Sequence, residues 1–247
     1  MTPSYWARRA RRHLMLASAG TVGSILVYAM ADDKPTVAFK ASMAFGYASL
    51  ALLALTLAIG PWRVLHGRPS PVSTDLRRDV GIWSALLAIA HVVTGLAVHM
   101  RGQFWLYFFP PPEERHAIPL RLDGFGLANH TGLAATLLLV LLLAISNDIA
   151  LRRLGARRWK LVQRLNYAAA AFVALHGAAY VYMDKRATGF VLFFVLLLLG
   201  SGGLQVAGAR RIRAARRVPA SQHGTEGQRA ANERTLAAEE GKDRGAE

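Results

Sequence analysis

Residues 81–100, GIWSALLAIAHVVTGLAVHM, contain no side chain with a fixed charge. At about 1.5 Å per residue, a helix of this length crosses a hydrocarbon core of roughly 30 Å. His91 lies near the middle of the stretch. An ionisable side chain at the centre of a bilayer is costly, so its presence there indicates a functional role. We therefore expect a membrane-spanning helix that carries a site.

Five other stretches are similarly apolar and similarly long, and soluble core helices rarely stay apolar for that length. The chain as a whole is 53% hydrophobic, with a mean hydropathy of +0.25. This pattern predicts an all-α polytopic membrane protein, a bundle of six transmembrane helices. The expected spans are residues 14–31, 41–60, 81–100, 127–146, 165–183 and 189–208.

The expected bundle occupies residues 1–208, and residues 209–247 are predicted to form a cytoplasmic tail that begins basic and continues polar and disordered. The first span has an alternative interpretation. Its arginines, its apolar run and the small residues Ala29 and Ala31 are also typical of a cleaved signal peptide. The even alternation of charge between successive loops favours its retention in the mature protein.

The formal net charge is +15 and the pI is near 11.1. The basic residues flank the apolar stretches, so we expect them to set topology and meet anionic lipid of the bilayer rather than nucleic acid. The more basic loops place both termini in the cytoplasm. The absence of cysteine excludes disulfides and cysteine-ligated iron–sulfur clusters. The strongly basic segments are residues 8–12, 63–78, 152–164 and 210–217, against the weakly basic 34–40, 101–121 and 185–186.

A second charge-free stretch, residues 165–183, carries His176 at almost the depth of His91. Imidazole is a ligand that suits iron. Two imidazoles at one depth therefore predict an axial pair that binds a haem iron. Both spans also offer small neighbours on the histidine face, among them Ala88 and Gly95. The alternative is that both histidines are hydrogen-bonded inside the bundle or line a polar cavity.

The other histidines lie nearer the expected membrane surfaces. His99 and His130 are predicted at the outer rim, where together they would form a second metal or substrate site. Histidines at an interface need no such role, so this site is the weaker hypothesis. The remaining four are expected to be solvated, and no arrangement for hydrolysis or zinc binding is found. They are His13, His66, His116 and His223.

Several ordered motifs resemble the ferric reductase-like transmembrane family. They are LTLAIGP at 55–61, RRDVGIW at 77–83 before His91, ISND at 145–148, RRLG at 152–155 and RWKL at 158–161 before His176. Within the family, the chain is most similar to the haem-binding membrane subunits of bacterial periplasmic methionine-sulfoxide reductase systems. The resemblance implies b-type haem held by histidines on the third and fifth helices of a bacterial inner-membrane protein. It also implies that electrons come from quinol or from a separate flavoprotein.

One position departs from the family pattern. Gln163 stands where the family usually has a second histidine on the helix of His176, and Arg77 and Arg78 stand at the corresponding place before His91. Neither residue type replaces an imidazole as a haem ligand. We therefore expect one haem per chain.

The sequence thus predicts a cytochrome that passes single electrons from a cytoplasmic donor, quinol or flavoprotein, to a periplasmic acceptor. The donor is expected near the most basic loop, which holds Arg157, Arg158, Lys160 and Arg164. The first alternative is a ferric or other metal-ion reductase with its substrate near His99, His116 and His130. The second is a membrane scaffold or carrier with buried histidines and no redox role.

Overall fold

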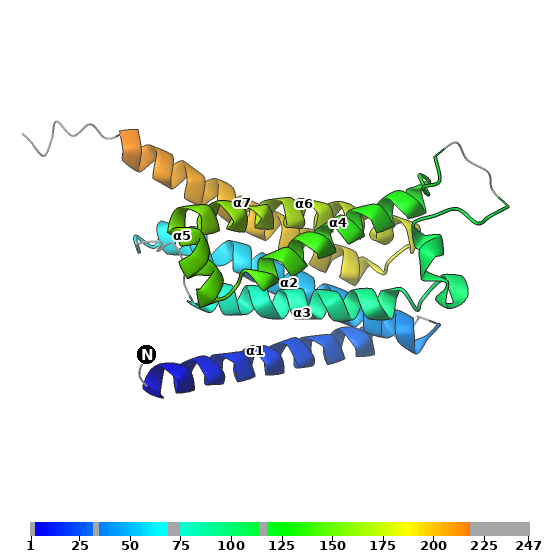
Figure 1. Cartoon of the computed structure of the whole chain (residues 1–247), viewed down its shortest axis with the longest axis horizontal. Helices are drawn as coiled ribbons and strands as arrows, with labels where there is room; N and C mark the ends of the chain where they lie inside the picture. The colour runs from blue at the N-terminus through cyan, green and yellow to red at the C-terminus, as the bar shows by residue number, and fades with distance from the viewer. Residues whose placement is uncertain (1–2, 32–34, 69–74, 114–117, 218–247) are drawn as a thin grey trace, which may run out of the picture.

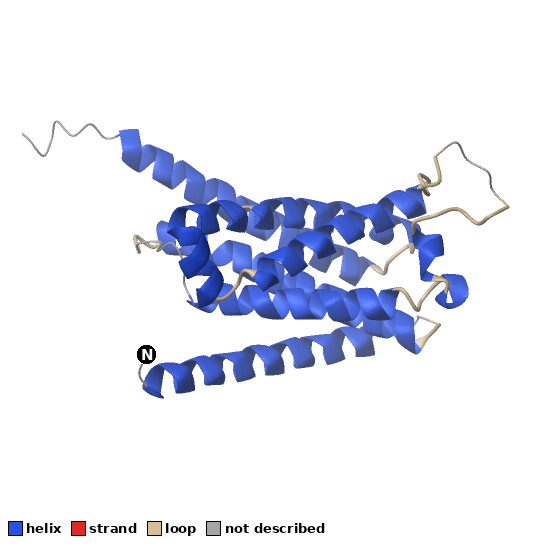
Figure 2. Cartoon of the chain, viewed as in Figure 1, coloured by secondary structure: helices blue, strands red, loops and turns tan. Residues whose placement is uncertain are grey.

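The computed structural model describes residues 3–31, 35–68, 75–113 and 118–217, and throughout these ranges every regular element is a helix (Figure 2). The prediction of an all-α fold is confirmed. The elements are α1 (Pro3–Met30), α2 (Val37–Leu65), α3 (Asp75–Gly95), η1 (Met100–Gly102), η2 (Phe104–Tyr107), α4 (Gly124–Ala144), α5 (Asp148–Gln163), α6 (Leu165–Met183) and α7 (Thr188–Arg217).

Six long helices run side by side along the longest axis, and the shorter α5 lies at one end of them (Figure 1). α2 packs against α3, α7 and α1, and α4 packs against α6. The end that holds α5 and the start of α1 is called here the basic end. The end that holds η1 and η2 is called the aromatic end. Two helix pairs, α2–α3 and α4–α6, form the centre of the bundle.

Four helices, α1, α2, α4 and α7, are long and apolar enough to cross a membrane by length and composition. The histidine helices α3 and α6 are not among them, although they lie in the same bundle. Large apolar side chains are exposed on its outer faces: Leu26 is 59% exposed, Leu137 61% and Leu196 67%. Soluble proteins rarely expose apolar surface so extensively, so these faces fit contact with lipid. The chain is a polytopic membrane protein.

The third predicted span, residues 81–100, differs from the structure at its end, because α3 (Asp75–Gly95) contains residues 81–95 and stops before residues 96–100. The Tyr107 hydroxyl donates a hydrogen bond of 2.9 Å to the Gly95 carbonyl and accepts one of 2.8 Å from the His99 amide. Carbonyls of the last helical turn have no partner within their own helix. The buried Tyr107 supplies one, so the chain leaves the helix before His99.

The basic segment before His176, predicted as a loop between spans, is largely helical as α5, with a kink at Gly155, where φ is 71°. The Asn147 side chain accepts a hydrogen bond from the Ala150 amide at 2.8 Å, which caps its first turn. Trp159 is 4% exposed, and its indole N–H donates to the Ile145 carbonyl at 3.0 Å. Trp159 therefore packs α5 against the bundle, while the basic side chains of α5 are exposed.

Helix α7 continues through Arg217, so the first arginines of the expected tail are helical. Residues 218–247 lie outside the described part of the chain. The division of the sequence at residue 208 stays a prediction.

The two central helix pairs meet through small side chains. Ser49 on α2 and Ser84 on α3 each donate their hydroxyl to the other's carbonyl, at 2.9 and 3.0 Å. A buried cluster of Leu53, Ala85, Ala88, Leu139 and Ala169 joins α2, α3, α4 and α6. Small residues let membrane helices approach closely. This packing lies toward the basic end from the histidines and holds the helices that carry them.

Candidate functional site

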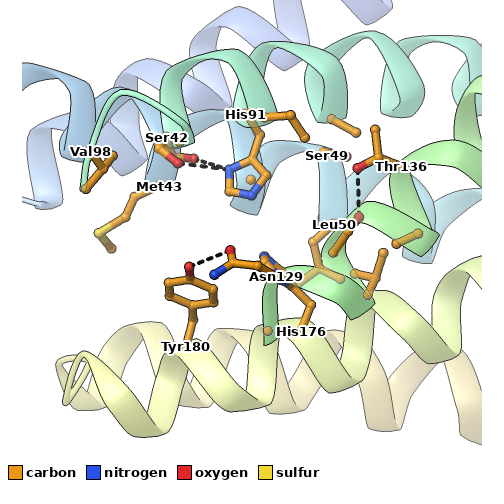
Figure 3. A pocket seen from close by; sticks show the side chains of 18 of the residues that line it. Ser42, Met43, Ser49, Leu50, His91, Val98, Asn129, Thr136, His176 and Tyr180 are labelled. Atoms are coloured by element: carbon orange, nitrogen blue, oxygen red, sulfur yellow. Dashed lines mark hydrogen bonds between the residues drawn. The ribbon is translucent and has the colours of Figure 1, made fainter. Parts of the chain in front are cut away.

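A cavity of about 280 Å³ lies between α2, α3, α4 and α6. His91 enters it from α3 and His176 from α6, so the imidazoles project from helices on opposite sides (Figure 3). Their ring centroids are 6.0 Å apart and the ring planes differ by 77°. This placement agrees with the expectation that the two histidines lie at the same depth in the bundle.

Each imidazole is held by a backbone carbonyl of the neighbouring helix. The Nδ1 atom of His91 is 2.8 Å from the Ser42 carbonyl oxygen, and that of His176 is 2.9 Å from the Ala128 carbonyl oxygen. A carbonyl only accepts hydrogen bonds, so both Nδ1 atoms carry the proton and donate. In a neutral imidazole the other nitrogen, Nε2, then keeps its lone pair. Nε2 is therefore the ring atom through which either histidine would bind a metal.

Two glycines make room for these rings. A Cβ atom at Gly46 would lie 2.9 Å from His91 Nδ1, and one at Gly132 would lie 2.6 Å from His176 Nδ1. Gly46 follows Ser42 by one helical turn, and Gly132 follows Ala128 by the same interval. Each histidine thus lies against a glycine and reaches the carbonyl of the preceding turn. The α2–α3 and α4–α6 pairs repeat one arrangement.

Gly46 and Gly132 were not predicted from the sequence to belong to the site. A signal was present, because the two glycines precede the two histidines by almost the same number of residues. The pairing of a glycine on one helix with a histidine on the next becomes recognisable only when the helices are placed side by side.

The separation of the two rings suits one metal ion between them. Nitrogen–metal bonds of about 2 Å on both sides of an ion place two imidazole centres roughly 6 Å apart. The donation of Nδ1–H to a carbonyl is also the usual arrangement around a metal-binding histidine, because it orients the ring and strengthens Nε2 as a ligand. The residues present therefore fit an axial pair on a planar metal complex.

Polar groups border the cavity beside His176. The Tyr180 ring lies 4.9 Å from the His176 ring, and its hydroxyl donates to the Asn129 side chain at 2.9 Å. Arg186, Asp184, His99 and Tyr107 line the cavity at the aromatic end. Its interior portion is lined by apolar side chains such as Leu50 and Leu139. The charged side chains of the lining therefore lie at the aromatic end, whereas the lining toward the basic end is mostly apolar and contains the hydroxyls of Ser49 and Thr136.

His99 and His130 have different surroundings. His99 lines the cavity and packs against Phe39, Tyr107 and Phe125. The His130 ring packs against Phe108, and its buried Nε2 has no hydrogen-bond partner among the described residues. Within those residues no group of three or more His, Asp or Glu side chains is placed to bind a metal ion. His116 lies outside the described part, and the second site stays a prediction.

A second cavity, of about 500 Å³, lies at the basic end. Lys160, Gln163 and Arg164 of the predicted donor region line it, together with Arg77 and Arg78. The other two predicted residues, Arg157 and Arg158, are exposed on α5. Gln163, Arg77 and Arg78, the residues at the positions that depart from the family pattern, thus lie around one cavity.

Ion pairs brace the basic end. The Arg78 guanidinium donates to the Asp148 carboxylate at the start of α5, and this hydrogen bond lowers the pKa of Asp148 below its ordinary value. Asp79 is fully buried and lies 3.2 Å from Arg9, 3.2 Å from Arg12 and 3.4 Å from His13. These contacts tie α3 to α5 and to α1.

His13, which was expected to be solvated, is only partly so, with 31% of its side chain exposed. Its Nδ1 accepts a hydrogen bond from the Trp83 indole at 3.2 Å, and its Nε2 faces Asp79. His66 is exposed and bonds the Trp62 carbonyl of its own helix. His116 and His223 lie outside the described residues.

A family model described as the ferric reductase like transmembrane component matches residues 45–174. The protein-methionine-sulfoxide reductase heme-binding subunit MsrQ of Deinococcus radiodurans is 33% identical over 159 residues, 64% of this chain and 69% of the relative. The MsrQ subunits of Xanthomonas axonopodis pv. citri and Xanthomonas campestris pv. campestris are 31% and 32% identical over 174 residues, 70% of this chain and 73% of theirs.

No solved structure matches the chain. The family match covers more than half of the sequence, from residue 45 to residue 174, so it includes His91 and ends two residues before His176. The chain therefore belongs to the ferric reductase-like transmembrane family.

Proposed function

We propose that this protein is a b-type cytochrome of the bacterial inner membrane that binds one haem through His91 and His176. It transfers single electrons from a cytoplasmic-side quinol or flavoprotein to a redox acceptor on the periplasmic side. The similar MsrQ subunits are named for haem binding and for a methionine-sulfoxide reductase, which supports the cofactor and the class of partner.

The observation that carries the proposal is the matched support of the two imidazoles. Each donates Nδ1–H to a carbonyl one turn before a glycine, and each keeps Nε2 for a ligand bond. An isolated buried histidine needs one such hydrogen bond. Two histidines with the same support and ring centroids 6.0 Å apart are explained together by a metal complex between them.

The bound haem supplies reversible one-electron chemistry at its iron. The chain's own residues determine where and in which environment that occurs. Ser42 and Ala128 fix the tautomer and orientation of the histidines through their carbonyls. Apolar side chains around the cavity would limit the access of water to the metal. Burial of this kind and the hydrogen bonds to the ligand histidines are means by which a protein tunes the reduction potential of a haem.

Ligand chemistry at the basic end supports one haem. Arg77, Arg78 and Gln163 line the cavity there. A guanidinium stays protonated in proteins and has no lone pair to donate, and an amide is a poor ligand beside imidazole.

That second cavity and α5 instead suit the approach of an electron donor. Lys160 and Arg164 line the cavity, while Arg157 and Arg158 extend the exposed positive surface along α5. Such a surface attracts the acidic face of a flavoprotein through long-range electrostatics. The cavity offers a quinol headgroup polar contacts beside apolar walls. The positive-inside rule assigns this end to the cytoplasm.

A pyridine haemochrome assay and an optical spectrum of the purified protein test the proposal. One haem per chain with a low-spin spectrum is expected. His91→Ala and His176→Ala should each abolish that spectrum, while His99→Ala and His130→Ala, the matched histidine controls, should retain it. Two haems per chain, or a normal low-spin spectrum in His176→Ala, would contradict the proposal. A purified protein without haem would favour the scaffold or carrier alternative, whereas efficient Fe(III) reduction by reconstituted protein would favour a metal-ion reductase.

A further inference from the structure

Arg186 lies in the short connection between α6 and α7 at the aromatic end, yet its side chain is only 10% exposed. Its Nη2 atom donates to the Asp184 carboxylate at 2.8 Å. The guanidinium carbon lies 5.3 Å over the centre of the Phe39 ring. These contacts hold the planar group in one orientation at the border of the cavity.

The other terminal nitrogen of this guanidinium, Nη1, forms no such hydrogen bond within the described part of the chain. Nη1 of Arg186 is buried and has no hydrogen-bond partner among the described residues. A buried donor without an acceptor costs about 1–3 kcal/mol, and more when it is charged. Its position therefore fits an acceptor that belongs to a ligand.

Arg186 lines the same cavity as His91 and His176. The charged side chains of its lining, Arg186 and Asp184, lie at the aromatic end. The lining around Leu50 and Leu139, toward the basic end, is uncharged and mostly apolar. A ligand that fits this space has an anionic edge and an apolar body. Haem has both, because its two propionate groups extend from one edge of an otherwise apolar macrocycle.

We propose that Arg186 binds a haem propionate through Nη1, so that the carboxylate edge of the macrocycle faces the aromatic end. This inference rests on the proposed haem site between His91 and His176. Asp184 keeps the guanidinium oriented, and Phe39 packs against its face. Charge-assisted hydrogen bonds from arginine to carboxylate are among the strongest in proteins. Arg186 thereby determines which way round the haem enters the cavity.

The test compares protohaem with its dimethyl ester, in which the propionates carry no charge. Full-length protein produced under haem limitation is titrated with each compound, and the low-spin absorbance gives an apparent affinity. The variants are wild type, Arg186→Gln and the control Lys185→Gln, which removes a neighbouring but exposed positive charge. Wild type and Lys185→Gln should bind protohaem at least about tenfold more tightly than the ester.

In Arg186→Gln the ratio of the affinity for protohaem to the affinity for the ester should fall to nearly one. The affinity for protohaem should decrease, whereas the affinity for the ester should stay unchanged. The midpoint potential of its haem should also be lower, because a positive charge near the iron favours the reduced state. If Arg186→Gln does not accumulate, Arg186→Lys keeps the charge without the planar fork, and its preference should lie between the two.

The outcomes separate the two proposals. A wild-type protein that binds neither compound would overturn the haem site and this inference with it. A wild-type protein that binds haem, combined with an Arg186→Gln variant that keeps the full preference for protohaem, would overturn only the role of Arg186. An equal loss of affinity for both compounds would show that Arg186 only supports the fold.

Discussion

Gly132 provides the space in which His176 lies, because a Cβ atom at that position would be 2.6 Å from the imidazole Nδ1. The same relationship links Gly46 to His91 at 2.9 Å. The mobility of both rings is limited by backbone on one side and by a carbonyl hydrogen bond at Nδ1. A side chain as small as a methyl group should therefore disturb the site.

Gly132→Ala should lower the haem content of the purified protein and broaden or remove the low-spin spectrum. The displaced ring loses its bond to the Ala128 carbonyl, and overpacking of this kind costs about 1–3 kcal/mol. Gly46→Ala should have a smaller effect because its contact is longer. Gly202→Ala is the matched control, since a Cβ atom there meets nothing within 4 Å. Equal haem content in Gly132→Ala and Gly202→Ala would contradict the interpretation.

Asp79→Asn should destabilise the protein by roughly 3 kcal/mol, because breaking a buried ion pair leaves charge without its partner. The substitution removes the common partner of Arg9, Arg12 and His13, which join α1 to α3. Thermal unfolding in detergent measures the change. Asp75→Asn is the control, since the Asp75 side chain is 37% exposed and lies on the same helix. Similar melting temperatures for the two variants would refute a special role for Asp79.

The pairing of Asp148 with Arg78 predicts a pH dependence of stability. The hydrogen bond from Arg78 lowers the folded-state pKa of Asp148 below the ordinary 3.8. A carboxylate with a lowered folded pKa contributes stability above its unfolded pKa, and that contribution is lost as the pH falls through the folded value. Wild type should therefore exceed Asp148→Asn by about 1 kcal/mol at pH 7, and this difference should shrink as the pH falls below the ordinary pKa of 3.8.

The measurement is the difference between the melting temperatures of the two proteins across that pH range. Glu113→Gln, which alters an exposed carboxylate, serves as the control and should show no such change in its difference from wild type. A constant gap between wild type and Asp148→Asn from pH 7 to pH 3 would argue against the ion pair.

Replacing Arg157, Arg158 and Lys160 together by Gln should slow reduction of the haem by its natural donor and leave haem content unchanged. All three side chains are exposed on α5, so the change removes attraction for the donor rather than internal packing. Raising the ionic strength should slow the wild type more than the variant, because salt screens exposed charges. Arg210→Gln with Arg211→Gln removes exposed charge from α7 instead and should have little effect. An unchanged reduction rate in the α5 variant would remove the support for a donor surface there.

The absence of native cysteine allows the orientation in the membrane to be measured directly. Gln103→Cys at the aromatic end and Ala156→Cys on α5 both introduce a thiol at an exposed position. In intact cells with a permeable outer membrane, an impermeant maleimide should label position 103 and not position 156. After the inner membrane is opened, both should react. The reverse pattern in intact cells would overturn the predicted topology.

The sequence by itself determined the all-α membrane fold and the selection of the two deep histidines. Both properties depend on local composition. In lipid, a long apolar stretch can form the hydrogen bonds of its own backbone groups only as a helix, and an ionisable side chain within such a stretch is costly. The end of α3 at Gly95 and the helical structure of α5 were not predicted from the sequence. Tyr107 terminates α3 and Trp159 anchors α5, and both act through contacts with carbonyls of other segments.

Only the tertiary structure decided how the histidines are supported and what surrounds them. The roles of Gly46 and Gly132 depend on the neighbouring helices. Each glycine lets an imidazole of the helix packed against it approach the backbone closely. In the sequence, Arg186 is one of a few charged residues expected on the outer side of the membrane. In the fold its side chain lines the cavity, and its Nη1 atom has no acceptor among the described residues. Burial and hydrogen-bond satisfaction depend on residues far apart in the chain, so no local pattern contains them.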